Sequence, residues 1–255
     1  MPAYFRGTMI KTFRQYLREE AKKSAHIFDV DETTFTYPHE HDPKIHLVHT
    51  TTGKRVASFS NMDWNGTQLP HDHRWDFSDF TNASLFQKGA RPIRPVVNLI
   101  KKHMKDAKEN PDKMHVAFLT ARDNLDDVGK TIETFGRHGI NIQPTGVPGA
   151  HAHLHRSGEK EKTARLKDKM DRLYSNEPPL EIGSAAEGKL VHLLNMHHEQ
   201  GVEDMHMYDD NPEIFKTMKE YSRRTGTKST FHHVITDSTG TFRIRQYHFN
   251  GKNEE

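Results

Sequence analysis

The sequence contains no cysteine, so disulfide bridges and zinc sites built from thiolates are excluded. No apolar run approaches the ~20 residues that a membrane-spanning helix needs. The N-terminal segment 1–23 lacks the apolar core of a secretory signal, and its pattern is that of an amphipathic helix with Ile10, Phe13 and Leu17 on one face. These absences predict a cytoplasmic protein with no membrane segment.

Apolar residues are also scarce, at 33% of 255 residues, with a mean hydropathy of −0.89. They nevertheless cluster in periodic segments, which favours a folded chain over a disordered one. The length fits one large domain or a core with one or two insertions. The net charge is only +2, but residues 214–252 contain eight Lys and Arg against two Asp and Glu. That local excess bears on the partner, because a basic surface attracts polyanions.

Strand-like and helix-like segments alternate along much of the chain. Strand patterns occur at 25–31, 115–121, 139–145, 204–210, 230–237 and 241–249. Helical patterns occur at 94–108, around 125–135, within 146–185, from about 187, and at 212–224 with Pro212 as the first residue. This alternation predicts an α/β fold with a Rossmann-like parallel sheet and helices on both of its faces.

Two stretches interrupt the alternation. Residues 36–93 contain a hairpin-like segment at 44–60 and an irregular aromatic stretch. Residues 146–185 contain a charged helix and a loop in which His151, His153 and His155 alternate. On a strand these histidines would share a face and could bind Zn²⁺, but loop-like surroundings favour an exposed polar loop. We therefore expect a core of 1–35, 94–145 and 186–255 with two insertions.

Polar side chains stand at the ends of three predicted strands. Asp29 and Asp31 end the first, Thr120 ends the second, and Asp209 with Asp210 follows a later one. In open parallel sheets, ligands collect at the carboxyl ends of the strands. Two neighbouring clusters of carboxylates would repel each other unless a cation lay between them, and oxygen ligands without cysteine favour Mg²⁺.

Further groups point to phosphoryl transfer. The hydroxyl of Thr120 and the ammonium of Lys189 suit the outer oxygens of a phosphoryl group. Asp31 is free to carry a proton if its side chain is not a metal ligand. A metal, a carboxylate nucleophile, a proton carrier, a hydroxyl and an amine together favour a phosphatase that works through an aspartyl-phosphate.

The motifs and their order resemble the haloacid dehalogenase (HAD) superfamily of phosphohydrolases. The first motif of that family, Asp-x-Asp-x-Thr, is matched by "DVDET" at Asp29–Thr33. The second is matched by "VAFLTAR" with Thr120, and the third by Lys189 in "SAAEGKLVHLL". The fourth is matched by "HMYDDNPE" with its acidic pair at 209–210. The resemblance implies a HAD-like core in which the two insertions occupy the places of caps.

The resemblance also implies roles for these residues. Asp29 is expected to be the nucleophile and Asp31 the general acid and base. Mg²⁺ would be held by Asp29, the backbone carbonyl of Asp31 and Asp210, with Asp209 assisting. One departure is Glu32, which stands where the family often has glycine.

Substrate contacts are expected from the same motifs, at Thr33, Ala121 and Arg122. Arg122 is ambiguous, because it would either touch a substrate phosphate or pair with Asp123 or Asp126. The sequence "TARDN" resembles members that act on nucleotides and polynucleotide ends.

The substrate and some alternatives stay open. The basic C-terminal segment favours a nucleotide or a nucleic-acid end, while the neutral insertions fit a phosphorylated small molecule equally well. A response-regulator receiver would have its acidic pair on the first strand, which is the reverse of the order here. A phosphomutase and a non-catalytic protein that binds phosphate or metal would share the fold.

Overall fold

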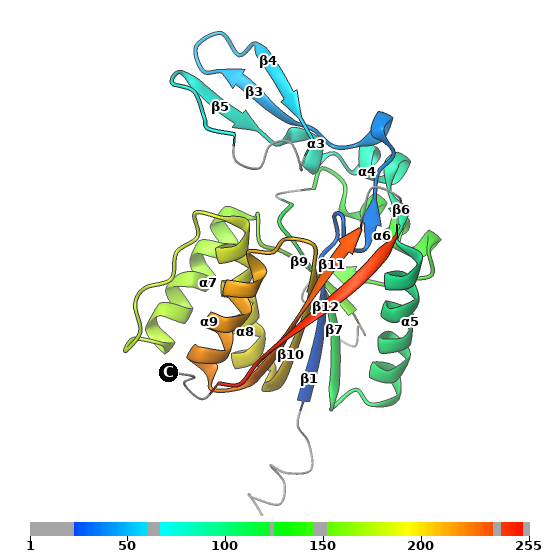
Figure 1. Ribbon diagram of the computed structural model, residues 1–255, viewed down its shortest axis with the longest axis vertical. Coiled ribbons are helices and arrows are strands. Elements are labelled where there is room, and N and C mark those ends of the chain that lie inside the picture. Colours follow the sequence, from blue (N-terminus) through cyan, green and yellow to red (C-terminus); the bar gives the residue numbers. More distant parts are fainter. Residues whose placement is uncertain (1–22, 61–66, 123–124, 145–151, 237–240, 252–255) are drawn as a thin grey trace, which may run out of the picture.

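The computed structural model describes residues 23–60, 67–122, 125–144, 152–236 and 241–251. Its main feature is a seven-stranded sheet, seen in Figure 1. In order across the sheet, the strands are β12 (Phe242–Phe249), β11 (Lys228–Thr236), β10 (Val202–Asp209), β1 (Lys23–Phe28), β7 (Met114–Thr120), β9 (Ala152–Arg156) and β8 (Gln143–Pro144). All neighbours run parallel except β11 and β12. The predicted α/β fold with a mostly parallel sheet is confirmed.

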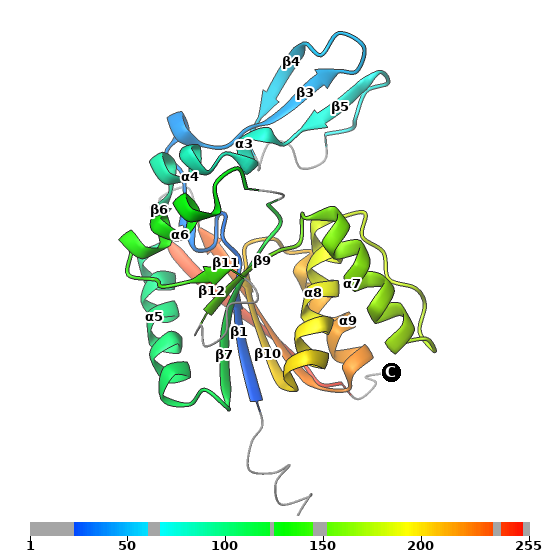
Figure 2. The ribbon, with the colours of Figure 1, turned by 180° about the vertical axis from the view of Figure 1, so that it is seen from behind.

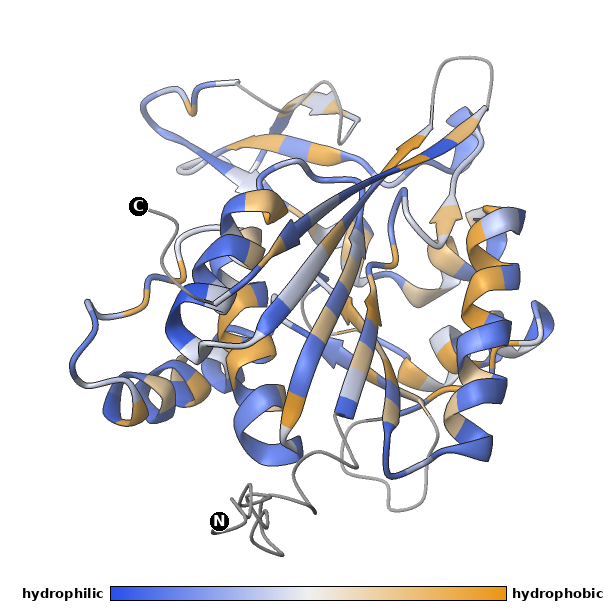
Figure 3. Ribbon diagram, turned by 60° about the horizontal axis from the view of Figure 1, so that its bottom comes forward, coloured by the Kyte–Doolittle hydropathy of each residue, from blue (hydrophilic) through white to orange (hydrophobic). Residues whose placement is uncertain are grey.

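Helices cover both faces of this sheet (Figures 1 and 2). One face packs against α5 (Arg94–Glu109) and α6 (Val128–Arg137), and the other against α7 (Lys160–Leu173), α8 (Ala185–Gln200) and α9 (Ile214–Thr225). Successive residues of a strand point to opposite faces, so Ile27 and Phe28 enter two different cores. Figure 3 shows hydrophilic residues on the outer sides of the helices. Burial on both faces explains why the central strands read as continuous apolar runs.

Residues 36–93 include a second, smaller sheet. Its three antiparallel strands lie in the order β4 (Arg55–Phe59), β3 (Ile45–His49) and β5 (His73–Asp76). The predicted hairpin at 44–60 is present, and Gly53 takes the left-handed conformation in its turn, with φ 66°. Figure 1 shows this sheet beyond the carboxyl ends of the main strands.

Short elements join the small sheet to the core. They are β2 (Phe35–Thr36), the 3₁₀ turn η1 (His39–His41), α3 (Ser78–Thr81), α4 (Ala83–Gly89) and β6 (Arg91–Pro92). Strands β2 and β6 pair with each other. Phe86 of α4 is fully buried and packs edge-on against Phe35, so the last part of this range belongs to the main core.

The second predicted insertion, 146–185, is not separate from the core. Strand β9 pairs with β7 inside the main sheet, and α7 packs beside α8. Ala152, Leu154 and His155 are buried, so the expectation of an exposed polar loop is wrong for His155, while His151 lies outside the described residues. The polarity of the alternating histidines favoured a loop in the sequence, but β9 lies in the main sheet, whose two faces are covered by helices.

Smaller differences concern where elements begin. Helix α9 starts at Ile214 and not at Pro212, which lies in the preceding turn. Helix α8 starts at Ala185, where Ser184 and Glu187 form a capping box. The amphipathic helix expected in 1–23 lies almost wholly outside the described residues. Among the helices that are described, none is long and apolar enough to cross a membrane.

Candidate functional site

Three carboxylates meet at the carboxyl edge of the main sheet. Asp29 directly follows β1, Asp209 ends β10, and Asp210 follows it. Because β1 and β10 are parallel neighbours, their ends coincide, and one oxygen from each carboxylate lies within 4.8 Å of the others. Asp29 and Asp209 are 5% and 1% exposed and so are shielded from water, while Asp210 is half-buried.

Lys189 joins two of these carboxylates. Its ammonium donates to Asp29 Oδ1 at 2.7 Å and to Asp209 Oδ2 at 2.6 Å. The capping box at the start of α8 fixes the helical register that brings the lysine, itself buried, to this place. Three carboxylates and one ammonium leave a formal charge of −2 at the edge of the sheet, and that is the charge a divalent cation neutralises.

The pKa values reflect this crowding. Burial, followed by the charge of Asp209, raises the pKa of Asp210 to about 7. Burial also raises the pKa of Asp29, although the charge of Lys189 opposes the shift. Burial alone would lower the pKa of Lys189, but Asp209 and Asp29 together raise it. The carboxylates therefore gain from any further positive charge, and the lysine stays protonated.

Thr33 extends the cluster. Its hydroxyl, on a side chain that is fully buried, donates to Asp210 Oδ1 at 3.1 Å. Thr34 donates to the backbone carbonyl of Asp29 at 2.6 Å. The run of hydroxyls after Asp31 thus orients the carboxylate site, and the predicted substrate-binding residue Thr33 contacts Asp210.

Asp31 faces a different partner. Its carboxylate receives hydrogen bonds from Arg122 Nε at 2.9 Å and Arg122 Nη2 at 2.6 Å, and from Tyr37 Oη at 2.5 Å. Burial would raise the pKa of Asp31, but the charge and hydrogen bonds of Arg122 and the bond from Tyr37 lower it. Its side chain is therefore anionic and is not part of the carboxylate cluster.

Arg122 also contacts the smaller part of the fold. Its Nη1 donates to the backbone carbonyl of Phe80 in α3 at 2.8 Å, and its guanidinium lies over the rings of Phe80 and Phe86. The sequence suggested a substrate phosphate, Asp123 or Asp126 as its partner. Asp126 instead accepts from the backbone of Ala83, and Asp123 lies outside the described residues.

Glu32 adopts a backbone conformation that favours glycine. Its φ is 54°, in the left-handed region that costs most residues energy. Burial raises the pKa of its carboxyl to about 7, while a hydrogen bond from Thr36 opposes the shift. The residue that departs from the family pattern thus stands where the backbone would accommodate glycine.

Thr120 is held by Arg122 and by Ser157, a residue that the sequence did not single out. Its backbone carbonyl accepts from the backbone and the hydroxyl of Ser157, at 2.8 and 3.1 Å. Its own hydroxyl accepts from the backbone N–H of Arg122 at 3.1 Å. A Cβ on Gly158 would lie 2.1 Å from the carbonyl oxygen of Ala121, so only glycine fits this crossing. The sequence "RSG" at 156–158, where β9 ends, would have indicated this close crossing if the strand had been recognised.

His153 and His155, the two alternating histidines that the structure describes, are not part of a group of converging metal ligands. Within the described part of the chain, the group of possible ligands that converges is Asp29 with Asp209 and Asp210. His155 lies 6.1 Å from His192, measured between ring centroids, and burial lowers its pKa well below the usual value. His155 of β9 and His192 of α8 therefore act as neutral packing groups.

Comparison of the chain with protein-family models, with curated proteins and with solved structures found no match. The resemblance to the HAD superfamily therefore stays a prediction that depends on the four motifs and on the geometry above.

Proposed function

We propose that this protein is a Mg²⁺-dependent phosphatase that hydrolyses a phosphomonoester through an aspartyl-phosphate on Asp29. The observation that carries the proposal is the convergence of Asp29, Asp209 and Asp210 within 4.8 Å, with Lys189 bridging two of them, at the carboxyl edge of a parallel sheet.

The donor set fits Mg²⁺. All three candidate ligands are carboxylates, and no sulfur or imidazole converges with them among the described residues. Hard oxygen donors and a residual charge of −2 suit a divalent hard cation. Asp29, Asp209 and Asp210 would hold Mg²⁺, together with the backbone carbonyl of Asp31. When bound, the ion would neutralise charge on the phosphoryl oxygens and on the attacking carboxylate.

In the first step, a carboxylate oxygen of Asp29 attacks phosphorus. The P–O bond to the leaving group breaks, and the leaving oxygen takes a proton. In the second step, water attacks the aspartyl-phosphate, inorganic phosphate leaves, and Asp29 is regenerated. Lys189 stays charged throughout and stabilises the Asp29 carboxylate and the phosphoryl oxygens beside it, since its pKa is raised.

Asp31 is the expected proton carrier. With Arg122 and Tyr37 bound to it, Asp31 is an anion, which suits the base that removes a proton from water in the second step. Donation to the leaving group requires a protonated Asp31, and so a conformer in which the contact with Arg122 is relaxed. The link from Arg122 to Phe80 would let the insertion influence that change.

The substrate is a phosphorylated small molecule, a nucleotide or a nucleic-acid end. The basic segment 214–252 favours the nucleic-acid classes, but two of its arginines are already paired. Arg223 contacts Glu177 and Glu220, and Arg224 contacts Glu220. Arg243 and Arg245 remain on β12, whose first residues lie at the same edge of the sheet as the ends of the parallel strands.

A phosphate-release screen tests the proposal. Sugar phosphates, nucleotides and oligonucleotides with 3′- or 5′-phosphates are compared in Mg²⁺ and in EDTA. We expect release that EDTA abolishes and Mg²⁺ restores, and an acid-stable adduct of one phosphoryl group on wild-type protein but not on Asp29→Asn.

The matched control is Asp168→Asn, which removes an exposed carboxylate on α7 with the same change of shape. Residual turnover of about a tenth of wild type in Asp29→Asn, a difference of ~1.4 kcal/mol in the barrier, would exclude Asp29 as nucleophile. Mg²⁺ binding without turnover of any substrate class would favour the non-catalytic alternative, and transfer between two positions of a sugar phosphate would favour the phosphomutase.

A further inference from the structure

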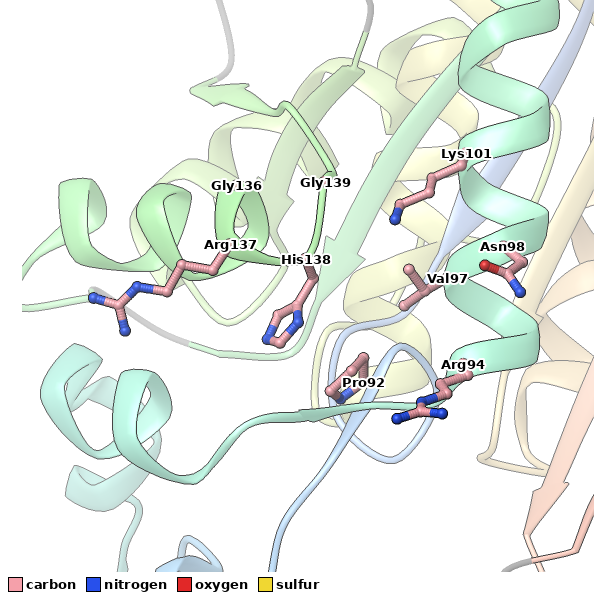
Figure 4. A pocket seen from close by; sticks show the side chains of 9 residues that line it. All are labelled: Pro92, Arg94, Val97, Asn98, Lys101, Gly136, Arg137, His138 and Gly139. Carbon is pink, nitrogen blue, oxygen red and sulfur yellow. The ribbon is translucent and has the colours of Figure 1, made fainter.

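A pocket of about 540 Å³ lies between α5 and the end of α6, as Figure 4 shows. Pro92 and Val97 form part of its wall, and the turn at Gly136–Gly139 borders it from the α6 side. None of its lining residues belongs to the carboxylate site. The segment that includes Phe35 lies between the two, since Phe35 pairs with Pro92 in the β2–β6 ladder and its ring lies 5.4 Å from that of His138.

Positive charge gathers in this pocket. The cations Arg94, Lys101 and Arg137 line it together with His138, and none of the lining residues is acidic. Arg137 pairs with Glu133 at 2.7 Å, and its side chain points away from the others in Figure 4. Arg94 and Lys101 both extend from α5 on the side that faces α6 (Figure 4), and neither has a hydrogen-bond or ion-pair partner among the described residues.

No side chain that lines the pocket offers these two cations a compensating charge. Arg94 stands in the first turn of α5, where the helix macrodipole is positive and an acidic residue would normally be favoured. No side chain caps this helix start, and no acidic residue lies in its first turn. Arg94 at the positive end of a helix of 16 residues, and Lys101 further along the same helix, produce a positive potential that an anion would relieve.

The opposite wall of the pocket is shaped around the lysine. A Cβ on Gly139 would lie 2.9 Å from Lys101 Nζ, so the glycine, with φ 74°, leaves room for the ammonium. Burial, and then the charges of Lys101, Arg137 and Arg91, lower the pKa of His138. The ring is therefore neutral at pH 7 and available as a hydrogen-bond donor to an oxygen in the pocket.

We propose that the pocket formed by Arg94, Lys101, His138 and the Gly136–Gly139 turn binds a phosphate-bearing anion at a site separate from the three carboxylates. A guanidinium and an ammonium that face the same space, with a neutral imidazole beside them, match the several oxygens of a phosphate. Two sources share this chemistry, namely a small polyphosphate and the backbone of a nucleic-acid strand.

Because the pocket is separate from the carboxylates, anion binding can be measured without catalysis. In EDTA the carboxylate site holds no divalent cation that would attract an anion, so binding under that condition reports on other surfaces. Inorganic pyrophosphate is titrated calorimetrically, and a fluorescein-labelled single-stranded oligonucleotide is titrated by anisotropy. The proteins compared are wild type, Arg94→Gln with Lys101→Gln, and the control Lys105→Gln with Lys108→Gln.

The control removes two positive charges from exposed positions further along the same helix, so net charge and helix are matched. We expect the Arg94 and Lys101 variant to bind pyrophosphate at least about tenfold more weakly, since it loses charge-assisted hydrogen bonds to the phosphate oxygens. The control should bind like wild type. Equal thermal midpoints for the three proteins establish that the fold is intact.

The two sources give different results. If the ligand is a nucleic-acid strand, the oligonucleotide binds more tightly than pyrophosphate, and the slope of log K against log salt falls by about 0.7 for each lost phosphate contact. If it is a small polyphosphate, the binding of pyrophosphate depends on the pocket cations and the binding of the oligonucleotide does not. The site is refuted if wild type binds neither probe, or if the pocket variant and the control bind both equally.

Discussion

Asp31 and Arg122 form a two-pronged ion pair across 91 positions of the chain, with Nε–Oδ2 and Nη2–Oδ1 distances of 2.9 and 2.6 Å. The side chain of Arg122 is 2% exposed and that of Asp31 16% exposed. The pair therefore connects the loop after β1 with the loop after β7 in a setting of low dielectric. Because Arg122 also donates to Phe80, the position of Asp31 depends on three segments at once.

Replacing Arg122 is expected to affect both stability and the acid–base residue. Arg122→Ala leaves Asp31 as a partly buried carboxylate bonded only to Tyr37, which costs about 3 kcal/mol of unfolding free energy. The pKa of Asp31 should then rise, because the partner that lowers it is gone. Urea denaturation measures the loss of stability. The rise in the pKa of Asp31 is measured from the pH–activity profile, whose acidic limb should shift to higher pH.

Arg137→Ala is the control, because its pair with Glu133 is half exposed and should contribute ~0.5 kcal/mol or less. The double variant Arg122→Ala with Asp31→Asn should recover part of the lost stability. If Arg122→Ala is no less stable than Arg137→Ala, the buried pair does not have the role assigned to it.

The carboxylate cluster is expected to make stability depend on a divalent cation. Asp210→Asn removes one of three crowded negative charges, so in EDTA it should be more stable than wild type, by on the order of 1 kcal/mol. In Mg²⁺ wild type should gain about 2.7 kcal/mol at a concentration a hundred times the dissociation constant, and Asp210→Asn should gain little. Thermal unfolding with and without Mg²⁺ measures both.

Asp168→Asn should retain the full response to Mg²⁺. An unchanged melting temperature of wild type over the whole range of Mg²⁺ would count against a metal site at these carboxylates, whatever the activity data show.

The acidic residues at the strand ends were predictable from sequence for a physical reason. The apolar runs before Asp29 and Asp209 are buried on both faces, so their pattern is strong, and parallel neighbouring strands bring their ends together. Lys189 was expected from the resemblance, which implies a lysine early in the helix before the acidic pair. The main sheet, apart from β9, could be predicted in the same way.

What could not be predicted depends on contacts between distant loops. The partner of Arg122 is set by where the β7 loop meets Tyr37 and Phe80, and no local pattern encodes that meeting. Strand β9 was obscured because His155 is buried within it, whereas polarity scales treat histidine as an exposed residue. Ser157 and Gly158, at its end, were missed with it.

Buried histidines are expected to make the fold sensitive to acid. Burial, followed by neighbouring histidines, lowers the pKa of His26 to about 2 and that of His232 to about 3. Burial with Lys162 lowers the pKa of His192 to about 4. The unfolded chain binds protons near pH 6.5 while the folded one does not, so stability is full above pH 6.5 and falls as pH drops towards 4.

Each such histidine contributes a slope of up to ~1.4 kcal/mol per pH unit in that window. His192→Gln keeps a polar partner for Thr163 and removes the titration, so the slope from urea midpoints between pH 6.5 and 4.5 should become shallower by about one proton. His71→Gln, at an exposed position, should leave the slope unchanged. A stability that is flat across this range would mean that these rings are charged, or solvated, in the folded protein.

Glu32 offers a test of backbone strain beside the proposed nucleophile. Its φ of 54° is unfavourable for a residue with a Cβ, so glycine should fit this position better. Glu32→Gly and Glu32→Ala both remove the partly buried carboxyl and its bond from Thr36, and they differ only in the Cβ. We expect Glu32→Gly to be more stable than Glu32→Ala by about 1 kcal/mol, as measured by urea denaturation.

At ordinary backbone angles alanine is usually more stable than glycine, because it restricts the unfolded chain. If Glu32→Ala is the more stable variant, the left-handed conformation at this position is not kept in solution. The matched pair at Gly183, where φ is ordinary and the nearest atom to a Cβ is at 3.5 Å, should show alanine to be the more stable residue.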